Sequence, residues 1–182
     1  MIIPENVLLK FREMMGEVHT NPLLSIAPGR VEVLGNHTDY NGGLVLASTI
    51  NHFVWAVGMK SEIVKIHSIN FSETSEFDPN QVGPVVHDNW DKYVRGVYWA
   101  LSKKGLTTQG VTCVIYGDVQ IGAGLSSSAA LEVAFTNLVI ELNEIDLDLK
   151  TRATIAYEAE RHYCDIGCGI MDQFTSQLGE AN

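Results

Sequence analysis

The sequence predicts an α+β domain, because most stretches typical of β-strands come early in the chain and most helical stretches come late. A glycine-rich segment near residue 122 separates the two parts. Strands and helices do not alternate, as they would in the βαβ units of a parallel sheet. With 182 residues, the chain is long enough for one domain with a substantial core.

The part before the glycine-rich segment holds the predicted strands and two predicted helices. Apolar residues at helical spacing predict one helix over 5–16, after Pro4, and another over 90–104. The stretch 72–84 is polar and turn-rich. The β-type stretches lie at 23–27, where Pro28-Gly29 stops the run, and at 44–50, 52–59, 63–69 and 111–116.

Three helices are predicted after the glycine-rich segment. The first covers 125–142 and is entered directly from the glycine-rich loop. The second covers 147–163, with Asp146 or Asp148 as its N-cap. The third is short and begins near Met171.

Composition argues against several classes of partner. The formal net charge is −10 without a run of Lys or Arg, so neither nucleic acid nor an anionic membrane surface is a predicted partner. A small phosphate ligand is compatible with this charge, because backbone amides and a metal ion bind phosphate without net positive charge. No apolar run approaches about 18 residues, so no membrane span is predicted. The first residues lack a basic-then-apolar pattern, so no signal peptide is predicted.

The cysteines indicate a reducing compartment. Three cysteines, a small and odd number, predict reduced thiols in a cytoplasmic protein. His162, Cys164 and Cys168 lie close in sequence. A structural zinc site usually has four ligands at recognisable spacing, so a metal site at these residues is not favoured.

The segment IGAGLSSSAALEVA, residues 121–134, is the strongest chemical signal in the sequence. Gly122 and Gly124 allow the backbone to approach a ligand closely. Three serines follow at a predicted helix N-terminus, where free N–H groups and the helix dipole favour an anion. Two glycines and three consecutive serines are more than an ordinary serine N-cap requires, so the segment is predicted to bind phosphate.

Two common phosphate loops fit this segment poorly. A Walker A loop needs Gly-Lys-Ser/Thr, and the segment has no lysine. A dinucleotide fingerprint, G-x-G-x-x-G, would place Ser127 at its third glycine, and Gly117-Asp118 interrupts the approaching strand. Glu144 stands near the position of a ribose-binding acid, but a second helix follows where a strand is needed. Dinucleotide binding is therefore the weaker hypothesis, which binding of NAD(H) would revive.

Two carboxylates near the end of the sequence are candidates for chemistry. Glu160 lies late in one predicted helix, and Asp172 lies in the first turn of the next. A plain helix cap would explain Asp172, and a solvated helix surface would explain Glu160. The functional alternative is a base or a metal ligand.

Three segments, in this order, resemble the galactokinases of the GHMP kinase superfamily. APGRVEVLGNHTDYNGG (27–43) is similar to the galactokinase signature, and GAGLSSSAALEVA (122–134) is similar to the second GHMP motif. CGIMDQF (168–174) is similar to the segment that carries the catalytic aspartate. The resemblance implies the N-terminal domain of the GHMP kinase fold, which is ribosomal protein S5 domain 2-like. This fold has a mixed sheet with helices packed on one side.

The resemblance also implies an activity and its residues. The implied reaction transfers the γ-phosphoryl group of ATP to the C1 hydroxyl of galactose, with Mg²⁺. Asp172 is implied as the general base, with Arg30 beside it and beside the transferring phosphoryl group. The implied ATP-binding residues are Gly122, Ala123, Gly124, Leu125, Ser126, Ser127 and Ser128. The implied Mg²⁺ ligands are Ser128 and Glu160, and the implied sugar-binding residues are Asn36, His37, Thr38 and Asp39. Phosphoryl transfer needs positioning and charge neutralisation, which these residue types supply.

The chain departs from the family pattern at two positions and in length. Glu32 stands where the family usually has Asn, and Asn36 stands where it has a sugar-contacting Glu. An amide accepts less strongly than a carboxylate, so a kinase for another small sugar is an alternative. The third family motif and the C-terminal domain are not found in the 182 residues. We therefore expect one GHMP N-terminal domain over 1–182 that turns over poorly or not at all by itself.

A non-catalytic sensor of galactose and ATP is a further alternative, because some relatives of galactokinases have this role. The intact serine run together with Arg30, Glu160 and Asp172 favours an enzyme. An Asp172→Asn substitution separates the two hypotheses, since a sensor would keep its ligand response and an enzyme would lose turnover.

Overall fold

One five-stranded sheet organises the part of the chain that the computed structural model describes, which is residues 3–16, 21–35, 38–85 and 89–180. Its strand order is β1-β2-β5-β3-β4. The strands are β1 (Leu23–Leu34), β2 (Leu46–Ser61), β3 (Val64–Ser68), β4 (Glu73–Phe77) and β5 (Gly110–Gly117). β3 and β5 run parallel, and the other neighbours run antiparallel. The sheet is therefore mixed, as the resemblance implies.

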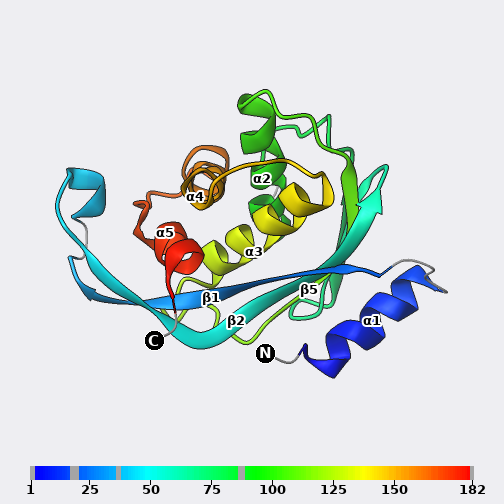
Figure 1. The fold of residues 1–182 in the computed structure, drawn as a ribbon, viewed down its shortest axis with the longest axis horizontal. Helices are drawn as coiled ribbons and strands as arrows, with labels where there is room; N and C mark the ends of the chain where they lie inside the picture. Colours follow the sequence, from blue (N-terminus) through cyan, green and yellow to red (C-terminus); the bar gives the residue numbers. More distant parts are fainter. Residues whose placement is uncertain (1–2, 17–20, 36–37, 86–88, 181–182) are drawn as a thin grey trace.

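Helices cover the two faces of the sheet unequally (Figure 1). α1 (Glu5–Met15) packs on one face against β2 and β5. The opposite face carries a helical layer made of α2 (Asp91–Lys103), α3 (Ser127–Leu142), α4 (Leu149–Glu158) and α5 (Met171–Leu178). The α+β class and the mixed sheet with its helical layer are confirmed, and α1 adds one helix on the second face.

Alternation of side chains along β2 and β5 builds the two layers. Ala56 of β2 and Ile115 of β5 belong to the main core beneath α2 and α3. Their neighbours Val57 and Val114 point to the other face and pack with Phe11 of α1. Both faces of the central strands are therefore buried, which explains their continuous apolar runs.

α3 is the central helix of the molecule. It contacts β1, β2 and β5 below it, and α2, α4 and α5 around it. Ten of its residues are buried, among them the acidic residue Glu132. The packing of α3 fixes the position of the glycine-serine loop that leads into it.

The strands differ from the predicted ranges in three places. β1 continues through Pro28-Gly29 to Leu34, because the pairing with β2 shifts register between Pro28 and Arg30. A bulge accommodates a proline, which has no N–H to donate to the ladder. The stretches 44–50 and 52–59 are parts of one strand, β2. The prediction missed β4, since this edge strand is polar and mostly exposed.

The helices lie close to their predicted positions. α3 begins at Ser127, two residues later than predicted. The prediction of one helix over 147–163 is correct up to Glu158, after which a π-helical turn (η2, Ala159–Tyr163) continues the chain. Asp148 is the N-cap of α4, and its side chain accepts from the Thr151 N–H at 2.9 Å. Of the helices in the described ranges, none combines the length and apolar character needed to cross a bilayer.

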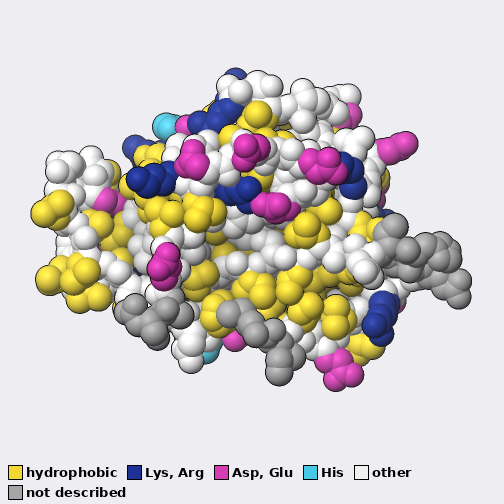
Figure 2. Space-filling model, in the orientation of Figure 1, with side chains coloured by type: hydrophobic (Ala, Val, Ile, Leu, Met, Phe, Trp, Pro, Cys, Tyr) yellow, Lys and Arg dark blue, Asp and Glu magenta, His cyan; other side chains and the backbone are white. Residues whose placement is uncertain are grey.

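The hairpin of β1 and β2 projects from one end of the molecule and exposes apolar side chains. A 3₁₀ turn (η1, Asp39–Asn41) lies between the two strands. This end lies at the left of Figure 1, and Figure 2 shows hydrophobic side chains gathered over it. The exposed apolar residues of the hairpin include Val33, Leu34, Leu44 and Leu46. This projecting end contains the segment that the sequence predicts for sugar binding.

Candidate active site

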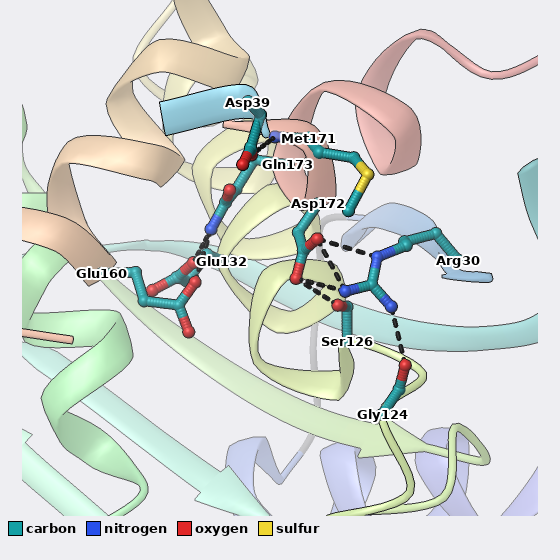
Figure 3. A network of polar contacts seen from close by, with 9 residues as sticks. All are labelled: Arg30, Asp39, Gly124, Ser126, Glu132, Glu160, Met171, Asp172 and Gln173. Atoms are coloured by element: carbon teal, nitrogen blue, oxygen red, sulfur yellow. Dashed lines mark hydrogen bonds and ion pairs between the residues drawn. The ribbon is translucent and has the colours of Figure 1, made fainter. Parts of the chain in front are cut away.

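Asp172 lies in the first turn of α5 and forms a two-pronged ion pair with Arg30 of β1 (Figure 3). Arg30 Nε donates to Asp172 Oδ1 at 2.8 Å, and Nη2 donates to Oδ2 at 2.7 Å. The Ser126 hydroxyl also donates to Asp172 Oδ2. Asp172 is not a helix cap, because the N-cap residue of α5 is Ile170. The structure brings Arg30 and Asp172 together as the resemblance implies.

Arg30 joins this carboxylate to the glycine-serine loop. Its Nη1 donates to the Gly124 carbonyl at 2.7 Å, and its backbone N–H donates to the Leu125 carbonyl at 3.2 Å. The pairing of β1 with β2 shifts register just before Arg30, and the Arg30 N–H faces the loop. The base candidate and the phosphate-loop candidate therefore share one arginine.

The loop itself, residues 122–126, has an unusual backbone. Gly122 and Gly124 have φ of +75° and +71°, and Ser126 has φ of +54°. The glycines adopt this region without strain, whereas Ser126 holds it at an energetic cost. The hydroxyl of Ser126 contacts Asp172 and does not cap α3. The first N–H groups of α3 thus have no side-chain cap among the described residues, and they are suited to receive an anion.

A cavity of about 380 Å³ opens beside the loop. The stacked rings of Phe71 and Trp90 line it, with ring centroids 6.1 Å apart and planes 4° apart. Its lining also includes Asn70, Tyr93, Ile121, Gly122, Ser127 and Ser128. The sequence reasoning missed the aromatic residues, since they come from separate segments with no common motif. A largely apolar cavity with aromatic walls, next to the uncapped start of α3, suits a nucleotide base and its phosphates.

Glu160 lies in the π-helical turn and is buried. Its side chain accepts from Gln173 Nε2 at 2.6 Å, and Gln173 Nε2 also donates to Glu132 at 3.1 Å. The residue exposures are 4% for Glu160 and 0% for Glu132 and Gln173. π-turns often occur at functional sites. The alternative that Glu160 is a solvated helix residue is therefore wrong.

The pKa values of both buried glutamates are raised. Burial raises the pKa of Glu160, and the Asp172 charge adds to the effect, while hydrogen bonds from Ser128 and Gln173 lower it. Burial also raises the pKa of Glu132 well above its usual range, and Glu160 adds to it. Two carboxyl groups without a cation beside them disfavour a second negative charge. A bound cation would relieve this repulsion.

Ser128 and Glu160 fit a magnesium ion held jointly with phosphates. Ser128 lies close enough to Glu160 to lower the pKa of its carboxyl group, so the two predicted ligands are neighbours. Within the described ranges, no group of three or more His, Cys, Asp or Glu residues could hold a metal ion. Mg²⁺ bound to nucleotides needs fewer protein ligands, because phosphate oxygens and waters complete its shell.

The predicted sugar-binding segment is described only in part. Asn36 and His37 lie outside the described residues. Asp39 Oδ2 accepts from the Met171 N–H at 3.2 Å, so it lies against the first turn of α5. Gly169 makes this approach possible, because a Cβ there would be 1.7 Å from Asp39 Oδ2. The Thr38 hydroxyl donates within its own turn, to the carbonyls of Gly35 and Leu44.

The topology contradicts the dinucleotide-binding alternative. In the described part of the chain, α3 is followed by α4 and not by a strand. The Rossmann arrangement requires a parallel strand after the helix that receives the phosphates. The glycine-serine loop therefore leads into a different fold.

Comparison with known proteins identifies the family. The galactokinase galactose-binding signature matches residues 9–60, and the GHMP kinases N terminal domain matches residues 92–180. A galactokinase of Chloroflexus aurantiacus is 39% identical over 165 residues, which are 90% of this chain and 42% of the relative. The chain thus spans less than half the length of this relative.

Solved structures agree with the family models. The structure of Lactococcus lactis galactokinase complexed with galactose superposes with a TM-score of 0.89 at 30% identity. The match covers 94% of this chain and 45% of that one. Mevalonate kinase of Methanococcus jannaschii has the same fold, with a TM-score of 0.74 at 16% identity. The chain belongs to the galactokinase family of the GHMP kinase superfamily and carries its N-terminal domain.

Proposed function

We propose that the protein is a sugar 1-kinase that transfers the γ-phosphoryl group of ATP to the C1 hydroxyl of galactose. The observation that carries this proposal is the shared network of Asp172, Arg30 and the glycine-serine loop. A base and a phosphate site must lie side by side for phosphoryl transfer, because the reaction depends mostly on positioning.

Each group in the network has a role in this proposal. Asp172 accepts the proton of the sugar hydroxyl, and Arg30 orients its carboxylate and lies beside the transferring group. The glycine-serine loop and the first turn of α3 hold the triphosphate. Ser128 and Glu160 would hold Mg²⁺, which neutralises the charge that develops on the phosphate oxygens.

The cavity beside the loop is the proposed site of the adenine base. Phe71 and Trp90 supply aromatic surface for a flat ring, while Asn70 supplies a polar side chain. Ser127 and Ser128 line the same cavity and continue into the phosphate loop. ATP bound in this way would place its phosphates between the cavity and Asp172.

Galactose is the proposed sugar, and another small sugar is the second candidate. The Lactococcus lactis relative binds galactose, and this chain carries the galactose-binding signature. Asn36 favours the second candidate, because the family usually has a glutamate there. Asp39 is a proposed sugar ligand that contacts the first turn of α5.

Turnover with a panel of sugars tests the proposal. A protein of the relatives' length that carries these residues should release ADP with galactose. Asp172→Asn should reduce this turnover about 10²- to 10⁴-fold, the usual contribution of a general base. Galactose and nucleotide binding should persist in the variant. Unchanged turnover in Asp172→Asn would overturn the role of the base. A response to galactose and ATP without any phosphorylated product would support the sensor alternative.

The same panel tests the choice of sugar. Asn36→Glu should shift the preference toward galactose if the amide broadens or alters specificity. An identical order of sugars in wild type and Asn36→Glu would contradict any role of this position in selecting the sugar.

The 182-residue chain alone is expected to turn over poorly. It spans 42% of the Chloroflexus relative, and the end that carries the sugar-binding segment is exposed and apolar. Normal galactose-dependent ADP release by these 182 residues would contradict this expectation. The three free cysteines and the net charge of −10 fit a cytoplasmic protein that acts on small molecules and binds neither nucleic acid nor membrane.

A further inference from the structure

Gln173 follows Asp172 directly and is fully buried. Its Nε2 donates to Glu160 Oε2 at 2.6 Å and to Glu132 Oε2 at 3.1 Å. A primary amide carries two N–H bonds, so both are used on carboxyl groups. Figure 3 shows these three side chains meeting on one side of α5, with Arg30 on the other.

We propose that Gln173 and Glu132 are positioning residues for the metal-binding end of the site. Gln173 fixes the carboxylate of Glu160, and Glu132 fixes Gln173. The inference rests on the proposed role of Glu160 as a ligand of the Mg²⁺ that accompanies ATP. Metal ligands depend on such outer partners for their orientation.

The network joins three separate elements. Glu132 comes from the middle of α3, Glu160 from the π-helical turn, and Gln173 from the first turn of α5. All three are shielded from water, so no bulk solvent can replace a lost hydrogen bond at low cost. Each side chain is held by a partner on another element, and the rotation of the Glu160 carboxylate is restricted.

Two unpartnered oxygens of the Glu132–Gln173 pair guide the choice of substitutions at Glu132. Glu132 Oε1 and Gln173 Oε1 have no hydrogen-bond partner among the described residues, although both are buried. They belong to the two groups that the 3.1 Å bond already joins. Glu132→Gln would keep an oxygen for Gln173 Nε2 and add an N–H for Gln173 Oε1. This variant should therefore preserve the network, whereas Glu132→Leu should break it.

The sequence position of Gln173 has a consequence for the whole site. Asp172 and Gln173 are consecutive, and they contact Arg30 and Glu160 respectively. The first turn of α5 thereby ties the proposed base to the proposed metal ligand. Loss of Gln173 should affect the metal-dependent part of nucleotide binding and leave sugar binding intact.

Calorimetric titration with ADP, in Mg²⁺ and in EDTA, tests the inference on the chain itself. Gln173→Met should reduce the gain in affinity that Mg²⁺ provides by about 10- to 100-fold, the usual effect of removing an outer partner. Affinity in EDTA should stay within about 2-fold, because a ligand-orienting residue acts only through the metal. Galactose affinity, measured separately, should not change.

Matched variants separate positioning from mere loss of a buried polar group. Thr136→Val removes a buried, unpartnered hydroxyl of α3, the helix that carries Glu132. This variant should leave the Mg²⁺-dependent gain in ADP affinity unchanged. In the Mg²⁺-dependent gain in ADP affinity, Glu132→Gln should resemble the wild type, and Glu132→Leu should resemble Gln173→Met. If Gln173→Met does not fold, Gln173→Asn replaces it, since it keeps the amide but shortens its reach.

The outcomes separate this inference from the proposed function. A Mg²⁺-dependent gain that Glu160→Gln removes but Gln173→Met leaves intact would overturn the inference alone. Equal losses in Mg²⁺ and in EDTA would also overturn it, because they indicate a purely structural role. A wild type without any Mg²⁺-dependent gain would contradict the proposed function and, with it, the inference.

Discussion

The two ends of the candidate site differ in how their negative charge is compensated. At one end, Asp172 receives two hydrogen bonds from Arg30 and one from Ser126. At the other end, Glu132 and Glu160 share the single neutral amide of Gln173. Asp172 belongs to the first end and Gln173 to the second, and these two residues are consecutive in α5. One end therefore carries its own cation, and the other has only a neutral amide beside its carboxyl groups among the described residues.

Carboxyl groups stand at both ends, but only those at the second end lack an ion pair with Arg or Lys among the described residues. A guanidinium beside a carboxylate satisfies its charge inside the protein. Burial raises the pKa values of Glu132 and Glu160, and repulsion between nearby carboxyl groups adds to the effect.

Removal of the arginine should have the largest effect on stability. Arg30→Met leaves the Asp172 carboxylate largely buried without its cation, which should lower the free energy of unfolding by about 3 kcal/mol. Urea denaturation measures this loss. The free energy of unfolding of Arg30→Lys should lie between those of the wild type and Arg30→Met, because lysine keeps the charge but cannot form the two-pronged pair. A double variant with Asp172→Asn should recover part of the loss. An Arg30→Met protein as stable as the wild type would contradict the compensation at this end.

Removal of a negative charge at the other end should instead raise the free energy of unfolding. Glu132→Gln should raise the free energy of unfolding in EDTA at pH 8, by about 1 kcal/mol, the scale of relieving an uncompensated buried charge. The native protein binds more protons than the unfolded chain above the usual glutamate pKa of 4.5. The free energy of unfolding of the wild type should therefore fall as the pH rises above 4.5, and that of Glu132→Gln should fall less over the same range.

Denaturation at several pH values measures this divergence. The two curves should run parallel once the pH falls below 4.5, where the glutamate of the unfolded chain becomes protonated like that of the native protein. A constant difference between wild type and Glu132→Gln at every pH would contradict a raised pKa at Glu132.

Substitutions of Ser126 should have the smallest effect and separate its two contributions. Ser126→Ala loses the hydrogen bond to Asp172 but keeps the backbone at φ +54°, so it should cost about 1–2 kcal/mol. Ser126→Gly loses the same bond but relaxes the backbone, so it should cost about 0.5–1 kcal/mol less than the alanine variant. Thermal unfolding compares the two. A glycine variant less stable than the alanine variant would show that the backbone of Ser126 is not strained.

Much of this arrangement was predictable from the sequence. The glycine-serine loop carries its own signal, since glycines at positive φ and serines at a helix start have few other reasons to occur together. The helices were predicted well because their apolar spacing is regular. Asp172 and Arg30 are 142 residues apart, and only the family motifs joined them before the structure did.

The remainder depends on contacts that local patterns do not encode. Gln173 lies inside a recognised motif, yet its role follows from Glu132 and Glu160, which come from other elements. The sequence does carry a signal at Glu132. A single acid in an otherwise apolar helix indicates a buried polar partner. The Phe71 and Trp90 cavity forms between separate segments. β4 was missed because an exposed edge strand lacks apolar alternation.

The most direct test of the division between the two ends compares Glu160→Gln with Asp172→Asn. ADP affinity is measured by calorimetry with Mg²⁺ and with EDTA for each variant and for the wild type. Glu160→Gln should lose the gain in affinity that Mg²⁺ provides, and Asp172→Asn should keep it within about 3-fold, because its carboxylate is already paired with Arg30. An equal loss of the gain in both variants would contradict the division.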